Sequence, residues 1–199
     1  MTALVSAVEG FYGADPKASL DYARIINDRH LQRLVGMLKG QSVAAGGQFD
    51  ATERYLAPTV VDDVTWDNPL MREEIFGPVL PVLGYDDLGD ALAGIEARPA
   101  PLSLYVFSRN PREQKRVLTL AAGAVTVNDT VIQFQNANLP FGGIGESGMG
   151  AYHGRGSFDT FTHRKAVLKR RSWPRLLGVR FPPYRLPMWL IKLSLKWFA

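Results

Sequence analysis

Hydrophobic residues recur along this chain at helical spacing in some segments and in short unbroken runs in others. The spacing predicts helices over residues 3–12, 21–39, 86–97 and 110–122, the last opened by an Asn-Pro pair. The runs predict strands over residues 55–61, 80–85, 102–108 and 123–128. Strands that alternate with helices in this way indicate an α/β fold with a mostly parallel sheet and flanking helices.

The same spacing predicts which side chains form the core. The inward positions of the second helix are Ile25, Ile26, Leu31, Leu34, Val35 and Leu38. The helix over residues 86–97 turns Leu88, Leu92 and Ile95 inward, and the run 102–108 predicts a buried strand. The pair Gly46-Gly47 predicts a turn.

An acidic and an aromatic side chain stand two residues apart in the stretch Arg72–Val79, just before the turn Gly77-Pro78. In an extended segment, residues two apart point to the same face, so Glu74 and Phe76 can contact one ligand together. A carboxylate accepts hydrogen bonds from sugar hydroxyls, and a ring lies against a flat heterocycle. The pair therefore suits a nucleotide cofactor, and the alternative is a buried Phe beside a surface Glu.

A glycine-rich stretch, Asn138–Gly150, contains Gly143–Gly148, which matches the pattern G-x-G-x-x-G. The dinucleotide-binding form of that pattern needs a preceding strand, a following helix and an acid about 20 residues further on. Here Asn-Leu-Pro-Phe precedes it, and position 168 is Leu. The stretch is therefore interpreted as a tight loop whose glycines allow close backbone approach.

Composition limits the chemistry of the chain. There is no cysteine, which excludes disulfides, thiolate metal sites and a cysteine nucleophile within these residues. The three histidines lack zinc-site spacing, so no metal is expected. The N-terminus does not have the pattern of a signal peptide, and no apolar run is long enough to span a bilayer.

Charge is divided unevenly along the chain. Residues 1–159 carry 13 Lys and Arg against 19 Asp and Glu, whereas residues 160–199 carry 10 Lys and Arg and no acid. The formal charges of −6 and +10 give the net +4. Nucleic-acid-reading motifs are absent, so no nucleic acid is expected. A membrane surface or an acidic neighbouring subunit is the expected partner of this basic tail.

The C-terminal region predicts two further elements. Residues Ser157–Leu168 begin as a turn or short helix and end as a strand that can add to another sheet or subunit. Pro187 then opens a short apolar helix, Met188–Phe198, on which Lys192 and Lys196 share a stripe with Arg185. Lysine stems and flanking tryptophans suit an interfacial helix, and the alternative is docking in a groove of the same protein.

Several motifs together resemble the C-terminal part of an aldehyde dehydrogenase of class 3. They are Glu73–Pro78, Leu102–Ser108, Val127–Asp129 and Leu139–Gly150, with class 3 character in Ala151–Gly154, Phe158–Arg164 and Arg180–Tyr184. The resemblance implies that the first 156 residues are part of the catalytic domain. Residues 157–172 would be an oligomerisation strand, and residues 173–199 a basic tail with an amphipathic helix.

The resemblance also implies roles for individual residues. The family oxidises aldehydes to acids with NAD or NADP, through a cysteine thiohemiacetal and hydrolysis of a thioester by a water that a glutamate activates. By position, Glu74 holds the ribose next to the nicotinamide and Phe76 packs on the nicotinamide ring. Phe141, Gly142 and His153 belong to the substrate pocket or its entrance. Asn128 is expected to hold a strand end.

The family's nucleophile, catalytic glutamate and cofactor-binding domain precede the Glu73–Pro78 motif, so no catalytic residue is assigned here. We expect a truncated chain that binds no cofactor and oxidises no aldehyde alone. A homodimer or a complex with a full-length subunit is expected, in the cytoplasm or peripherally at the inner membrane face. A non-catalytic binding module is the alternative. A hydrolase built from Ser157, Asp159 and His153 is a third option, although no nucleophile-elbow motif frames any serine.

Overall fold

The computed structural model describes residues 1–169 and 186–198, and it divides the chain into two compact units, Met1–Thr160 and Phe161–Ala199. The α-helices are α1 (Thr2–Tyr12), α2 (Asp28–Met37), α3 (Leu88–Glu96), α4 (Pro111–Val117), α5 (Gly154–Phe161) and α7 (Met188–Phe198). The strands are β1 (Ser42–Ala45), β2 (Phe49–Asp50), β3 (Tyr55–Leu56), β4 (Thr59–Asp62), β5 (Val79–Pro81), β6 (Ser103–Val106) and β7 (Ala124–Val127). Short 3₁₀ turns cover Pro69–Met71, Ile132–Gln135 and Gly145–Ser147.

The first predicted helix is confirmed, whereas the second begins later than predicted. Helix α2 starts at Asp28 because the side chain of Asn27 caps it, accepting a hydrogen bond of 2.8 Å from the backbone N–H of His30. The residues before this cap are not helical, and Ile26, predicted to be inward, is 78% exposed. Leu31 and Leu34 are buried as predicted.

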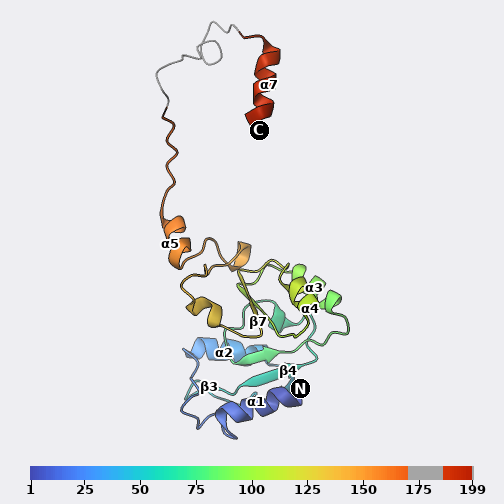
Figure 1. The fold of residues 1–199 in the computed structure, drawn as a ribbon. Coiled ribbons are helices and arrows are strands. Elements are labelled where there is room, and N and C mark those ends of the chain that lie inside the picture. Colours follow the sequence, from blue (N-terminus) through green and yellow to red (C-terminus); the bar gives the residue numbers. More distant parts are fainter. Residues whose placement is uncertain (170–185, 199) are drawn as a thin grey trace. The chain divides into compact units, whose positions relative to one another are not determined.

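The first sheet has the strand order β1-β4-β5, with β1 antiparallel and β5 parallel to β4. Alternate residues of β4 face opposite sides, since Val61 packs with α2 while Val60 lines a groove beside α1. Figure 1 accordingly shows α1 and α2 on opposite sides of β4. The core on the α2 side consists of Leu31, Leu34, Leu56, Val61, Val64, Leu70 and Val79.

The predicted strand over residues 55–61 is divided into β3 and β4. Pro58 lies between them and has no N–H to donate to a ladder. The β2–β3 hairpin and β1, all beside the Gly46-Gly47 turn, were not predicted. That turn is confirmed: both glycines have positive φ, and a Cβ on Gly46 would lie 2.1 Å from the carbonyl oxygen of Pro58.

Helices α3 and α4 pack on the parallel pair β6–β7 (Figure 1), around the buried residues Leu92, Val117 and Leu120. Leu88 and Ile95, predicted to be inward, join this core as partly buried residues. Helix α4 ends at Val117 and not at residue 122. The strand predicted as buried, β6, is only partly buried along its length.

The prediction of one mostly parallel sheet is only partly right. The described residues contain three small sheets, in which two strand pairs are parallel and two are antiparallel. The antiparallel pair β2–β3 has a short connection, whereas the whole β2–β3 hairpin lies between the antiparallel strands β1 and β4, and each parallel pair spans a helix or a 3₁₀ turn. The α/β class stands, but periodicity alone did not give the strand pairing.

After α5, residues 162–169 form no strand in this single chain. A strand exists only when a neighbour accepts its hydrogen bonds, so an oligomerisation strand over residues 157–172 stays a prediction about a second chain. Residues 170–172 and the motif Arg180–Tyr184 lie outside the described residues. Helix α7 covers Met188–Phe198, and no helix in the described part of the chain has the length and apolar character needed to cross a bilayer.

Candidate functional site

The loop from Arg72 to Pro78 connects a 3₁₀ turn to β5 and lies against α2. Within it Phe76 has a φ of 50°, which is left-handed backbone and not the extended conformation assumed from the sequence. Glu74 and Phe76 therefore do not lie on one face by strand alternation. Both residues are nevertheless exposed, Phe76 to 77%, so the alternative of a buried phenylalanine is wrong.

The two neighbouring glutamates of this loop have different surroundings. Glu73 Oε1 lies 2.7 Å from Arg33 Nη1 of α2 in an ion pair. For Glu74 the described residues provide no hydrogen bond or ion pair. A carboxylate without a protein partner at the edge of a cavity can accept hydrogen bonds from a ligand's hydroxyl groups.

The glycine-rich loop has the close backbone approaches expected for it. A Cβ on Gly142 would lie 2.0 Å from the carbonyl oxygen of Gly150, and one on Gly143 would lie 2.1 Å from that of Ser147. Phe141, which precedes the glycines, and Tyr152, which follows them, form an antiparallel bridge with hydrogen bonds of 2.9 and 3.0 Å. No strand directly precedes the glycines, and a 3₁₀ turn, Gly145–Ser147, lies within the pattern where the dinucleotide-binding form would open a helix, so rejection of that pattern is confirmed.

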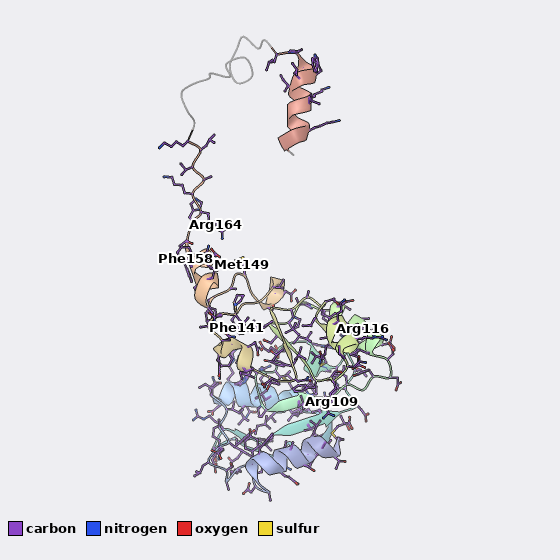
Figure 2. All side chains as sticks on the ribbon, in the orientation of Figure 1. Arg109, Arg116, Phe141, Met149, Phe158 and Arg164 are labelled. Carbon is purple, nitrogen blue, oxygen red and sulfur yellow. The ribbon has the colours of Figure 1, made fainter. Side chains whose placement is uncertain are left out.

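The structure brings together the residues predicted for the substrate pocket. The ring of His153 lies 4.3 Å from that of Tyr152 and 6.3 Å from that of Phe141, measured between centroids. Figure 2 labels Phe141 at one end of the glycine-rich loop and Met149 near the other. The buried Nδ1 of His153 has no hydrogen-bond partner among the described residues, which is uncommon for a buried polar atom.

A cavity of about 840 Å³ lies between the two loops. The Arg72–Pro78 loop contributes Glu73 and Glu74 to its wall, and the glycine-rich region contributes Phe141, Glu146 and Ser147. The sequence predicted a separate role for each loop, and only the tertiary structure shows that the two loops share one cavity. Phe76 is not part of this wall, so the structure does not bring Glu74 and Phe76 to one surface of it.

Several residues of the cavity wall were not predicted. They include Arg98, Ser103, Tyr105 and Gln133. Gln133 links two of them, because its Nε2 lies 3.1 Å from Ser103 Oγ and 3.3 Å from Tyr105 Oη. No motif marks Gln133 in the sequence, whereas Ser103 and Tyr105 alternate along β6 and could have been assigned to one face.

Two other expectations are decided by hydrogen bonds. Asn128 Oδ1 accepts from the backbone N–H of Ser108 at 2.9 Å, which confirms that Asn128 holds a strand end. The hydrolase triad is wrong, because Ser157 Oγ accepts from the backbone N–H of His153, and the described residues provide no hydrogen bond from the Ser157 hydroxyl to the His153 ring. The carboxylate of Asp159 meanwhile pairs with Arg155 at 3.0 Å.

The described residues contain no group of three or more His, Cys, Asp or Glu side chains placed to hold a metal ion. A nucleotide cofactor fits the residues in part. Glu74 offers an unpaired acceptor at the cavity for ribose hydroxyls, and Phe76 offers an exposed ring face for a heterocycle.

Comparison with known proteins identifies the family. Residues 2–167 match the aldehyde dehydrogenase family, and the chain belongs to it. Within the family its similarity is to the class 3 enzymes. The chain is 51% identical over 168 residues to the dimeric NADP-preferring aldehyde dehydrogenase of Bos taurus, covering 84% of this chain and 70% of that protein. It is 50% identical to aldehyde dehydrogenase family 3 member A2 of Mus musculus, covering 88% of this chain and 37% of that one.

Bacterial relatives also belong to the aldehyde dehydrogenases. The chain is 47% identical to the 4,4'-diaponeurosporen-aldehyde dehydrogenase of Staphylococcus aureus, covering 93% of this chain and 41% of that protein. The solved substrate-bound structure of Staphylococcus aureus AldH superposes with a TM-score of 0.82 at 45% identity, covering 98% of this chain and 43% of that one. The chain thus spans about two fifths of these two relatives.

Proposed function

We propose that this chain supplies the cofactor-ribose contact and the substrate entrance of an NAD(P)-dependent aldehyde dehydrogenase that converts an aldehyde to a carboxylic acid. The cavity between the Arg72–Pro78 loop and the glycine-rich loop carries this proposal, because both motifs contribute to its wall. Glu74 accepts hydrogen bonds from the ribose hydroxyls, and the exposed ring of Phe76 packs on the nicotinamide. On the other side of the cavity Phe141 forms the entrance, and Gly142 and His153, which adjoin Phe141 outside the cavity wall, belong to it as well.

The nucleophile has to come from residues outside this chain, since the 199 residues contain no cysteine. When bound, NAD or NADP supplies the hydride acceptor for the oxidation. The residues described here bind and orient the reactants. Phe141 and the neighbouring aromatic rings of the cavity wall exclude water from one side of the cavity. The chain alone is therefore proposed to bind no cofactor and to oxidise no aldehyde.

A chimera tests this function. The part of the Staphylococcus aureus relative that precedes the matched segment is joined to this chain, and NAD(P)H formation from aldehydes is followed by absorbance. We expect aldehyde-dependent turnover by the chimera and none by the chain alone. Glu74→Gln should raise the KM for the cofactor, whereas Glu96→Gln, at the end of α3 and outside the cavity, should not.

A folded chimera that binds aldehyde but forms no NAD(P)H would reject the catalytic role. Turnover by the purified chain alone would reject the requirement for an outside nucleophile. Several aldehydes and both cofactors belong in the assay, because the sequence specifies neither the aldehyde nor the choice between NAD and NADP.

A second function is favoured by the charge of the C-terminal region. We infer that the chain also pairs with a complete subunit through residues 157–172 and lies on a membrane surface through residues 185–199. Ten Lys and Arg with no acid follow residue 159, and Trp189 and Leu193 of α7 are exposed beside Lys192. This would place the protein in the cytoplasm, peripherally at the inner membrane face.

Two experiments test this binding role. Co-expression with a complete class 3 relative should give a complex that co-purifies, and separate elution would reject pairing. In liposome flotation the full chain should float, whereas a chain ending at Tyr184 should stay at the bottom. Equal flotation of both chains would reject the membrane role of the tail.

A further inference from the structure

One face of α2 carries a set of side chains that contact the Arg72–Pro78 loop. His30, Arg33 and Leu34 recur at spacings of three and four residues, which places them on a single stripe of the helix. Neither the family motif nor the sequence reasoning gave this stripe a role. Each of its contacts crosses about 40 residues of sequence.

The polar members of the stripe bind the backbone of the loop. His30 Nε2 lies 2.7 Å from the carbonyl oxygen of Phe76. Arg33 uses one terminal nitrogen for the carboxylate of Glu73 at 2.7 Å and the other for the carbonyl oxygen of Ile75. Arg33 Nε also lies 3.4 Å from His30 Nδ1, so the two side chains form one connected group.

The apolar member sets how close the loop can approach. Leu34 is fully buried, and a Cβ on Gly77 would lie 2.6 Å from its side chain. The loop therefore rests on Leu34 immediately after Phe76, the residue with the left-handed φ of 50°. Left-handed backbone at a bulky residue costs free energy and persists only where its surroundings impose it. The hydrogen bond from His30 to the carbonyl of Phe76 is such a constraint.

We propose that His30 and Arg33 are positioning residues for the cofactor contact, holding the loop so that Glu74 lines the cavity and Phe76 stays exposed. This inference rests on the proposed function of Glu74 and Phe76. Arg33 also distinguishes the two adjacent glutamates, because it engages Glu73 and leaves Glu74 unpaired among the described residues. Without Arg33, the carboxylates of Glu73 and Glu74 would both be free to bind the cofactor. The position of the loop along α2 would also be less well defined.

The chemistry of the group specifies the protonation of His30. The carbonyl oxygen of Phe76 can only accept a hydrogen bond, and Arg33 Nε can only donate one. Both contacts are satisfied together only when His30 carries its proton on Nε2 and leaves Nδ1 unprotonated.

The first test follows Phe76 in the full chain by ¹⁹F NMR with fluorinated phenylalanine, its signal assigned by its loss in Phe76→Leu. Arg33→Gln and His30→Ala should shift the Phe76 signal and leave the other signals in place. His30→Gln should restore it, since a glutamine amide can also donate to the Phe76 carbonyl. Arg29→Gln, exposed on the same helix, is the matched control and should change nothing.

Long-range ¹⁵N–¹H spectra of the parent chain should show His30 as the Nε2–H tautomer. A Phe76 signal unchanged in both Arg33→Gln and His30→Ala, or an Nδ1–H tautomer, would overturn the inference whatever the chain's function. If one of these variants unfolds, Glu73→Gln tests the same contact, because it removes only the charge that Arg33 engages. An unmoved Phe76 signal there would also count against the inference.

The second test uses the chimera described above. Arg33→Gln should raise the KM for the cofactor by about tenfold, the equivalent of one charge-assisted hydrogen bond, with kcat little changed. A fall in kcat at constant KM would overturn the positioning role. An inactive parent chimera would instead reject the proposed function, and the NMR test would still decide whether α2 positions the loop.

Discussion

At Gly142 there is no room for a single methyl group, because a Cβ there would lie 2.0 Å from a backbone oxygen that cannot move independently. At Gly36 in α2 the same methyl group would meet nothing within 4 Å. The two positions carry the same residue for different reasons. The first is required by a close approach in the candidate site, whereas the second only weakens a helix.

Alanine substitutions should therefore have opposite effects at these two positions. We expect Gly142→Ala to lower the free energy of unfolding by about 1–3 kcal/mol through forced displacement of the loop. Gly36→Ala should raise it by up to about 1 kcal/mol through helix propensity. Urea denaturation of both variants measures the difference, and equal effects would contradict the close approach at Gly142.

At the scale of elements, the β2–β3 hairpin is held at its turn by a network around one carboxylate. Asp50 Oδ2 lies 2.7 Å from Lys17 Nζ, and Asp50 Oδ1 accepts from the hydroxyl and the backbone N–H of Thr52 at 2.6 and 2.8 Å. Lys17, followed by Thr52, holds the pKa of Asp50 well below its usual range. The hairpin thus depends on a carboxylate that stays ionised in the folded chain.

This pKa gives the hairpin a defined pH dependence. A carboxyl whose pKa is lowered on folding stabilises the folded state above its ordinary pKa of about 4, and this contribution is lost as pH falls toward the folded value. The difference in urea midpoint between pH 7 and pH 3 should therefore be smaller in Asp50→Asn than in the parent. Asp67→Asn, an exposed carboxyl with no hydrogen bond or ion pair recorded in the described structure, should retain the parent difference.

At the scale of the whole molecule, the chain exposes much apolar surface. Leu20, Ile26, Phe76 and Met149 are each more than three quarters exposed, and the two small cores are separate. Beside α1 an apolar groove of about 440 Å³ is also open. Apolar surface on this scale is typical of proteins that associate with a partner.

We expect the isolated chain to associate. Light scattering after gel filtration should give a mass of at least two chains, and the melting temperature should rise with protein concentration. A sharp, concentration-independent melt of a monomer would contradict this. Mild detergent is the control, since it should reduce the mass if apolar contacts drive association.

The sequence was sufficient for features set by local chemistry. The cap at Asn110 and the Gly46-Gly47 turn depend only on residues a few positions apart. The sequence identified Asn110 and the turn, but it did not show that Asn27 would start α2. The glycine-rich loop was also interpreted correctly, because close approach needs glycine wherever it occurs.

Tertiary structure decided what depends on residues far apart in the chain. Strand pairing divided the predicted sheet into three, since hydrogen-bond partners are chosen by packing and not by periodicity. The left-handed Phe76 and the contacts from His30 and Arg33 arise from a helix more than 40 residues earlier, which no local pattern specifies. The sequence by itself determined which residues carry the chemistry. Only the folded chain determined that Glu74 and Phe141 share a cavity, because distances across space are fixed by packing.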